Sequence, residues 1–207
     1  MKSPLDVMFV LGTRPEVMKL GPVVLELKAH PRQFRVTLVS TGQHRDLVPQ
    51  YLKLFGLGID HDLKIMKRHQ TLGDITARTV QGMDALLKQH RPDVVMVQGD
   101  TTAVLAAGLT AFYHKVPVAH VEAGLRSNDR YDPFPEEINR RLTSPLAEIN
   151  LAPTPWAKRN LLKENIPAES IYVTGNTTID ALLYAAKRKP ARSAVPAEWL
   201  RGKRLVL

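Results

Sequence analysis

Short apolar runs alternate with segments of helical periodicity along almost the whole chain, and this alternation constrains the fold more than any other feature. The apolar runs predict β-strands at residues 6–11, 34–39, 93–98, 116–120, 148–152 and 171–173. Apolar residues at helical spacing predict helices at residues 15–27, 46–55, 72–90, 102–114, 136–147, 155–164 and 177–187. Strands joined by helices of this length form a parallel sheet with right-handed crossovers. The sequence therefore predicts an α/β fold with a doubly wound, Rossmann-like parallel sheet.

The composition is that of a globular domain and excludes several classes of protein. Of 207 residues, 44% are hydrophobic and 24% are charged, and there is no cysteine. A chain without cysteine is not a disulfide scaffold, a thiol enzyme, a Cys-zinc module or an iron–sulfur protein. No apolar run reaches the ~18 residues of a membrane span, and the first residues lack a signal-peptide core. We therefore expect a cytoplasmic protein with no membrane partner.

The net charge of +9 is concentrated at one end of the chain. Residues 187–207 account for +6 of it, because basic side chains there far outnumber the acid Glu198. The rest of the chain is close to balanced and has no basic stripe with interleaved aromatics, so we expect no nucleic-acid partner. An anionic partner could bind this tail, but the stretch 189–196 favours a solvated linker. An apolar run then opens at Arg204, from which we expect the natural protein to continue into a second domain.

Polar clusters follow the predicted strands, at the carboxyl ends where ligands bind to sheets of this kind. In the first, the turn 12–16, Gly12 permits a tight turn, the helix behind it attracts anions, and Arg14 adds a forked cation suited to phosphate or carboxylate. Arg14 and Val17 stand where a G-x-G-x-x-G motif needs glycine, so a tightly bound NAD is not expected. The alternative is an ordinary strand–helix turn with a surface arginine.

The other clusters place carboxylates at strand ends and at a helix start. They are 98–102 with Asp100, 120–127 with Glu122, and 133–141 with Glu136 and Glu137. Each has a structural alternative: Asp100 as a helix N-cap, Glu122 as a partner of Arg126, and the two glutamates as partners of the arginines that follow at helical spacing. Together, however, they would put three carboxylates and at least one arginine around a single crevice. That arrangement is costly unless a ligand or a reaction uses it.

His44, in the stretch 41–45 after the second strand, is a further candidate for a polar contact. His61, His69, His90 and His114 lack metal-ligand spacing, and the motif H-E-x-x-H is absent. We therefore expect no metal site.

Several stretches, in their order along the chain, closely resemble the non-hydrolysing UDP-N-acetylglucosamine 2-epimerases. They are residues 9–16 (FVLGTRPE), 41–45 (TGQHR), 97–102 (VQGDTT), 120–126 (HVEAGLR), 135–140 (PEEINR) and 173–177 (VTGNT). The resemblance implies the N-terminal half of a two-domain, GT-B-type architecture. Residues 1–174 would form a Rossmann-like catalytic half-domain, and 175–207 a linker helix and the start of a UDP-binding domain. It also implies UDP-N-acetylglucosamine and UDP as ligands, no cofactor, and a homodimer.

The resemblance also implies a mechanism and a set of site residues. UDP leaves C1, C2 loses its proton to give a 2-acetamidoglucal, and UDP then adds back as the proton returns to the opposite face. Carried over by motif, the catalytic carboxylates are Asp100 and Glu136, which we assign to proton transfer at C2, and Glu122, which we assign to electrostatic stabilisation. The substrate-binding residues implied are Arg14, Lys19, His44 and Arg126. A second, activating UDP-N-acetylglucosamine would contact Gln43, His44, Arg68, His69 and Glu136.

Three other functions remain open on the sequence. A GT-B glycosyltransferase acceptor domain needs at most one general base, so the clustered carboxylates count against it. A hydrolysing 2-epimerase would release free N-acetylmannosamine. These 207 residues could also act only as a binding or folding unit, and we expect no epimerisation from them alone because the nucleotide-holding half is missing.

Overall fold

A seven-stranded parallel sheet forms the centre of the molecule, with the strand order β3-β2-β1-β4-β5-β6-β7. The computed structural model describes residues 3–42, 48–188 and 196–202. The strands are β1 (Leu5–Leu11), β2 (Phe34–Ser40), β3 (His61–Asp62), β4 (Val94–Gln98), β5 (Val118–Val121), β6 (Ile149–Ala152) and β7 (Ile171–Val173). All neighbouring strands pair in parallel. The predicted doubly wound, Rossmann-like α/β fold is thereby confirmed.

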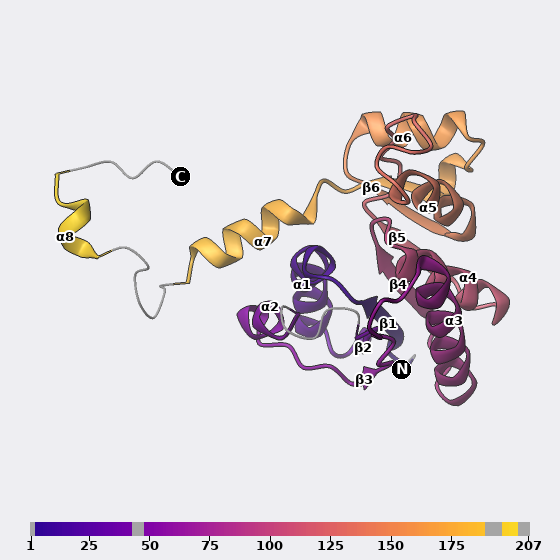
Figure 1. Cartoon of the computed structure of the whole chain (residues 1–207), viewed down its shortest axis with the longest axis horizontal. Helices are drawn as coiled ribbons and strands as arrows, with labels where there is room; N and C mark the ends of the chain where they lie inside the picture. Colours follow the sequence, from indigo (N-terminus) through magenta and orange to yellow (C-terminus); the bar gives the residue numbers. More distant parts are fainter. Residues whose placement is uncertain (1–2, 43–47, 189–195, 203–207) are drawn as a thin grey trace.

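Helices cover both faces of the sheet (Figure 1). They are α1 (Arg14–Ala29), α2 (Val48–Phe55), α3 (Leu72–Gln89), α4 (Thr102–Tyr113), α5 (Glu136–Thr143), α6 (Pro155–Lys163), α7 (Thr177–Ala186) and α8 (Ala197–Leu200). Short 3₁₀ helices, η1 (Ser144–Leu146) and η2 (Ala168–Ser170), precede β6 and β7. α1, α2 and α7 pack on one face, and α3, α4, α5 and α6 lie on the other.

Strand β1, which lies beside the middle strand β4, shows why the inner strands are largely apolar. Phe9 and its alternate neighbours contact the layer of α1 and α2, whereas Met8 and Val10 contact the layer of α3 and α4. All three side chains are buried, because a strand covered on both faces has no side exposed to solvent. Burying each of them contributes roughly 1.5–3 kcal/mol, so this strand is a major source of the free energy of folding.

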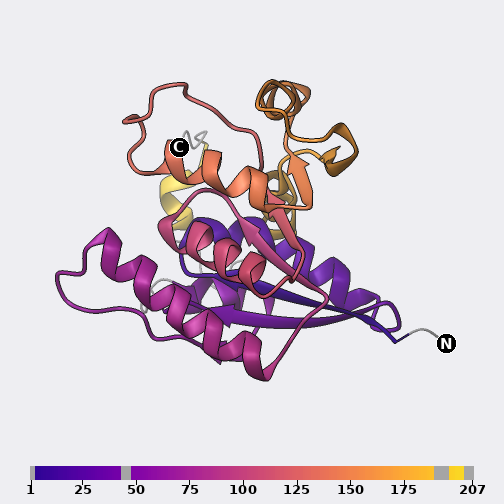
Figure 2. The same cartoon turned by 90° about the vertical axis from the view of Figure 1, so that its right-hand side faces the viewer.

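The carboxyl ends of β1, β4 and β5 lie at one edge of the sheet, and each is followed by a polar turn. The turn after β1 leads into α1, and the turn after β4 leads into α4. The segment between β5 and α5 is much longer and reaches out from the body as an extended loop (Figure 2). These connections bring segments that are far apart in sequence to the same place.

The structure differs from the predicted elements at a few positions. β3 was not predicted, because two exposed polar residues give no periodic signal. The helix predicted over 136–147 ends at Thr143 and continues as η1, where Pro145 has no N–H to donate. The strand predicted at 116–120 is shifted to Val118–Val121. α8 was not predicted either.

α7 packs back onto α1, and its Tyr184 stacks on Phe55 of α2 with ring centroids 5.1 Å apart. Most of the expected linker at 189–196, and the run that opens at Arg204, lie outside the described residues, as do Gln43 and His44. None of the helices described here has the length and apolar character to cross a membrane.

Candidate functional site

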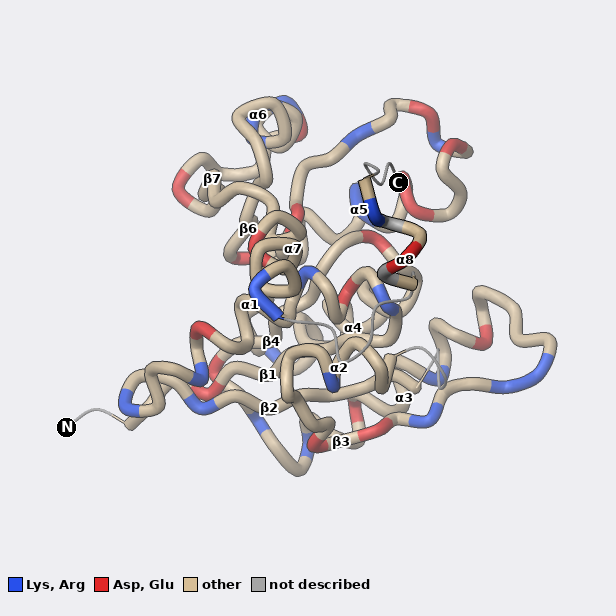
Figure 3. Tube along the Cα trace, turned by 90° about the vertical axis from the view of Figure 1, so that its left-hand side faces the viewer, with Lys and Arg blue, Asp and Glu red and all other residues tan. Residues whose placement is uncertain are grey.

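A crevice of about 340 Å³ opens at the carboxyl edge of the sheet, among the turns after β1, β4 and β5 and the start of α5. The carboxylates Glu16, Asp100, Glu122 and Glu136 line it, together with the cations Lys19 and Arg140. The structure therefore brings together the three acids predicted from separate segments. Acidic and basic positions are also interspersed along the loop between β5 and α5 (Figure 3).

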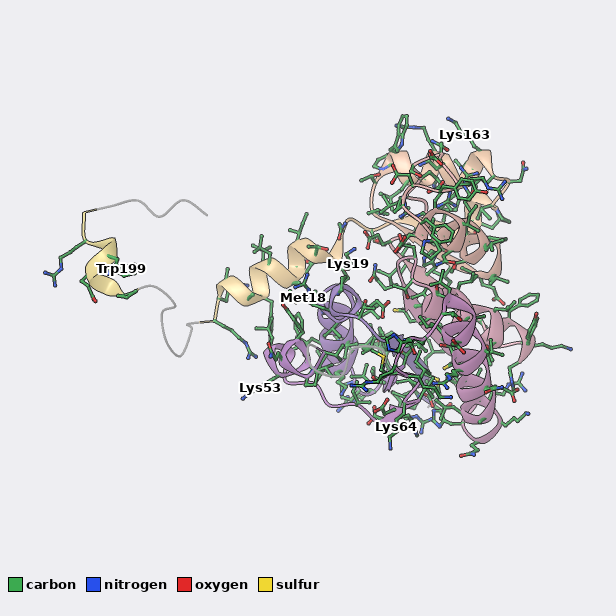
Figure 4. The ribbon with its side chains drawn as sticks, viewed as in Figure 1. Met18, Lys19, Lys53, Lys64, Lys163 and Trp199 are labelled. Atoms are coloured by element: carbon green, nitrogen blue, oxygen red, sulfur yellow. The ribbon has the colours of Figure 1, made fainter. Side chains whose placement is uncertain are left out.

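Glu122 follows directly after β5 and has a left-handed backbone, with φ of +67°. A non-glycine residue in this region carries a backbone cost of about 1–2 kcal/mol, which the surrounding structure must offset. Its carboxylate contacts the Lys19 ammonium and the Gln98 amide. Figure 4 labels Lys19 on the side of α1 that faces β5. The predicted alternative, pairing of Glu122 with Arg126, is therefore wrong.

Asp100 follows β4 and is held by α5. Its Oδ2 accepts a hydrogen bond of 2.6 Å from Arg140 Nη2, and its backbone carbonyl accepts one of 2.9 Å from Asn139 Nδ2. The N-cap of α4 is instead Thr101, whose Oγ1 accepts from Val104 N–H at 3.3 Å. The alternative in which Asp100 caps the helix is therefore wrong, and its carboxylate is available to the crevice.

The paired glutamates at the start of α5 have different environments. Glu136 lines the crevice, and within the described chain no hydrogen bond or ion pair engages its carboxylate. Glu137 is fully buried and accepts from Ser127 N–H, Asn128 N–H and Arg141 Nε at 2.8–3.2 Å. Although desolvation raises the pKa of Glu137, these hydrogen bonds outweigh it and hold the pKa below its usual value. The alternative with Glu–Arg pairs is thus correct for Glu137 alone.

Glu16 is a crevice residue that the sequence analysis missed. Its buried carboxylate accepts hydrogen bonds from the N–H groups of Gly12 and Thr13 and from the Thr101 hydroxyl, the last at 2.9 Å. Burial raises the pKa of this carboxyl, and the hydrogen bonds oppose the rise. The signal was present as Thr13-x-x-Glu16, the pattern of a capping box at a helix start.

Two predicted substrate-binding arginines lie outside the crevice lining. The Arg14 guanidinium is exposed and sits over the Tyr51 ring, 5.9 Å from its centroid. Arg126 has a buried side chain that makes a two-pronged pair with Glu164 at 2.6 and 2.8 Å and donates to Ser144 Oγ at 3.0 Å. Since these contacts use the Arg126 donors, the structure gives this residue a position between α5 and α6 instead of one in the crevice.

The residues expected at a second ligand site are not assembled into a described site. Arg68 and His69 are exposed on the segment between β3 and α3, and Glu136 lies in the crevice. Gln43 and His44 are outside the described residues, so the structure places neither of them. Among the residues it does describe, no three His, Asp or Glu side chains are grouped to hold a metal ion.

A buried histidine supports the turn after β4. His120 Nε2 lies 2.7 Å from the Gly99 carbonyl oxygen. Desolvation lowers the pKa of His120 to about 4, with a smaller opposing effect from that hydrogen bond and further lowering by the charges of Arg126 and Arg140. The ring is therefore neutral at pH 7 and packs beneath the segment that carries Asp100.

The fold and the crevice together define a Rossmann-like α/β domain with a crevice lined by carboxylates and two cations at the carboxyl edge of its sheet. Comparison with known proteins makes the assignment specific. The model of the UDP-N-acetylglucosamine 2-epimerase family matches residues 25–207, and the chain belongs to this family.

Relatives of known sequence or structure support this family assignment. The chain is 53% identical over 178 residues to the UDP-N-acetylglucosamine 2-epimerase of Bacillus subtilis, which covers 86% of this chain and 47% of the relative. The Neisseria meningitidis enzyme bound to UDP-GlcNAc matches with a TM-score of 0.84 and 48% identity, over 87% of this chain and 48% of that one. The Methanocaldococcus jannaschii enzyme in complex with UDP-GlcNAc and UDP matches with a TM-score of 0.81 and 40% identity, over 86% of this chain and 49% of that one.

The chain thus spans about half the length of the curated relatives it matches. Its solved relatives are GT-B-type epimerases, and it matches about half of each of their chains. The predicted resemblance and the half-architecture fold class are both confirmed.

Proposed function

We propose that the complete protein containing this chain interconverts UDP-N-acetylglucosamine and UDP-N-acetylmannosamine without hydrolysing either. The observation that carries the proposal is the convergence of Asp100, Glu122 and Glu136 on one crevice with Lys19 and Arg140. A glycosyltransferase acceptor site needs a single general base, whereas inversion at C2 needs acid–base groups on both faces of the sugar.

The proposed reaction begins with cleavage of the anomeric C–O bond, and UDP leaves with the bonding electron pair. C2 then loses its proton to a base, which gives a C1–C2 double bond in 2-acetamidoglucal. In the return step UDP oxygen attacks C1 while an acid delivers a proton to the opposite face of C2. Atoms and charge balance over the cycle, because one proton is taken up and one is returned.

The contacts in the crevice suggest how the roles divide. Glu122, held by Lys19 and Gln98, is suited to stabilise the positive charge that develops at C1. Asp100 and Glu136 reach the crevice from different elements, the turn after β4 and the start of α5. We assign them to the two faces of C2.

The resemblance to the family supports a proposal for the rest of the enzyme. We propose that residues 1–174 form the sugar-facing half, that residues from 175 lead into a UDP-binding domain, and that the complete enzyme is a cytoplasmic homodimer. Its product would feed cell-surface polysaccharide synthesis. A second, activating UDP-N-acetylglucosamine would be bound through Gln43, His44, Arg68, His69 and Glu136.

The test is product analysis of the complete protein given UDP-N-acetylglucosamine in D₂O without an acceptor. We expect UDP-N-acetylmannosamine with deuterium at C2, and a much slower reaction from an Asp100→Asn variant. Free N-acetylmannosamine with UDP would identify a hydrolysing enzyme. No turnover until an acceptor sugar is added would identify a glycosyltransferase.

A further inference from the structure

The turn between β1 and α1 has the geometry of an anion site. Gly12 and Thr13 precede a sixteen-residue helix, and N–H groups at a helix N-terminus attract anions through hydrogen bonds and the helix dipole. In the first turn of a Rossmann-like sheet these groups commonly receive a ligand's phosphate. Here both N–H groups donate to the same oxygen, Oε2 of Glu16.

Glu16 fills this position completely. Its other oxygen accepts from the Thr101 hydroxyl at 2.9 Å, and only 2% of the residue is exposed. The space on the far side of the turn is closed too, because a Cβ added to Gly12 would lie 2.0 Å from Thr41 Oγ1. A phosphate could therefore reach these N–H groups only by displacing the Glu16 carboxylate.

The charges around the turn also oppose the binding of a phosphate. Asp100 and Glu122 line the crevice beside Glu16, and the nearby Lys19 ammonium is already engaged by Glu122. A diphosphate at the turn would face these carboxylates without a free cation among the crevice-lining residues described here, since Arg140 is engaged by Asp100. Arg14, in the same turn, lies outside the crevice lining, and its guanidinium sits over the Tyr51 ring. Like charges placed this close oppose binding.

We propose that Glu16 is a built-in anion that occupies the phosphate position of the β1–α1 turn and excludes phosphate from it. The exclusion itself does not depend on the reaction. Its consequence for the substrate rests on the proposed function: the sugar ring, and not the diphosphate, lies at this edge of the sheet. Glu16 is thus a specificity-determining residue that fixes which end of the nucleotide sugar meets Asp100, Glu122 and Glu136.

Binding of inorganic phosphate to the 207-residue chain tests the exclusion. Calorimetry or phosphorus NMR would compare wild type, Glu16→Ala and Glu16→Gln at matched ionic strength in chloride. We expect Glu16→Ala to bind phosphate at least about tenfold more tightly than wild type, because two N–H donors and a hydroxyl become free. Glu16→Gln should behave as wild type, since its amide still fills the turn. A folded Glu16→Ala variant that gains no affinity, or a wild-type chain that binds phosphate equally well, would overturn the proposal.

Loss of folding in Glu16→Ala is also informative. If the variant is unfolded in chloride, phosphate or formate should restore its native circular dichroism by filling the vacated position, and failure of both anions to do so would contradict the proposal. The substrate consequence is tested in the complete protein, where phosphate should compete with UDP-N-acetylglucosamine in Glu16→Ala but not in wild type. A complete protein with no epimerase activity would refute the proposed function while leaving the phosphate result on the chain unaffected.

Discussion

Individual carboxylates in the crevice are distinguished by their partners. Glu122 contacts an ammonium and an amide, Asp100 is paired with Arg140, and Glu16 is buried beneath three donors. Glu136 has no partner within the described chain. The carboxylates that line one crevice are thus held by different partners.

Replacing Asp100 separates its chemical role from a structural one. In the complete protein, Asp100→Asn should lower kcat by roughly 10²–10⁴, the range expected for a lost acid–base group. The thermal midpoint should change little, because Thr101 and not Asp100 caps α4. Steady-state kinetics and thermal unfolding on one preparation check both points. Normal activity in a folded Asp100→Asn protein would remove Asp100 from the mechanism.

The backbone at Glu122 predicts an unusual order of stabilities. Glu122→Gly should leave the chain about 1 kcal/mol more stable than Glu122→Ala, because glycine adopts a φ of +67° without the cost that a Cβ brings. Both variants lose the same carboxylate, so the difference isolates the backbone. Gln98→Gly and Gln98→Ala, on the regular strand β4, are the matched control, and here the alanine variant should be the more stable of the two. Urea unfolding gives all four values, and equal stability of the two Glu122 variants would contradict the account.

His120 predicts a dependence of stability on pH. Its pKa is about 4 in the folded chain and near 6.5 when unfolded, so between these values the unfolded state binds the extra proton. Stability from this group is therefore present above pH 6.5 and is lost as the pH falls to 4, by about 3 kcal/mol. Urea unfolding of His120→Gln at pH 7 and pH 5 should lack most of the loss seen in wild type. An identical loss in both proteins would assign the dependence to other groups.

At the scale of elements, Arg126 joins the β5–α5 loop to two helices. It pairs with Glu164 at the end of α6 and donates to Ser144 Oγ, which in turn donates to the Arg140 carbonyl of α5 at 2.9 Å. Through this chain of contacts the end of α6 supports the helix that carries Glu136 and Arg140. We therefore interpret Arg126 as a positioning residue.

Removing the partner of Arg126 should be costly. Glu164→Ala leaves a buried guanidinium unpaired and should lower the free energy of unfolding by about 2–3 kcal/mol, which is less than the ~3–5 kcal/mol of fully buried pairs because Glu164 is partly exposed. Glu169→Ala, at an exposed acid on η2, is the control and should stay within about 0.5 kcal/mol of wild type. A Glu164→Ala chain as stable as the control variant would show that the pair contributes nothing.

Elements whose signal lies in their own residues could be predicted. β1 and β4 are largely apolar because both faces are covered, and α3 has one apolar face, so periodicity alone located them. The convergence of Asp100 and Glu122 followed from the rule that parallel strands end at one edge. The partners of charged side chains could not be predicted from the sequence. Arg126 pairs with Glu164 and not with Glu122 because of where α6 packs, which no local pattern shows. A two-residue exposed strand such as β3 carries no local signal at all.

At the scale of the whole molecule, this chain supplies one wall of the proposed site. The crevice holds carboxylates at the edge where the sugar would react, while Glu16 closes the turn where a phosphate would otherwise bind. On the proposed function, the diphosphate would then be held by residues outside this crevice. The 207-residue chain should accordingly show no measurable epimerisation of UDP-N-acetylglucosamine by nuclear magnetic resonance, whereas the complete protein should equilibrate the two sugars. Turnover by the chain alone would contradict this division of the site.

The proposed reaction requires the anomeric C–O bond to break and reform while the sugar stays in the crevice. Positional isotope exchange tests it most directly, using the complete protein and UDP-N-acetylglucosamine with ¹⁸O in the bond between C1 and the β-phosphate. If UDP is released and recaptured, the label will move from the bridging to the non-bridging oxygens of the β-phosphate. If epimerisation proceeds while the label stays in the bridging position, the C–O bond has not broken and the account is wrong.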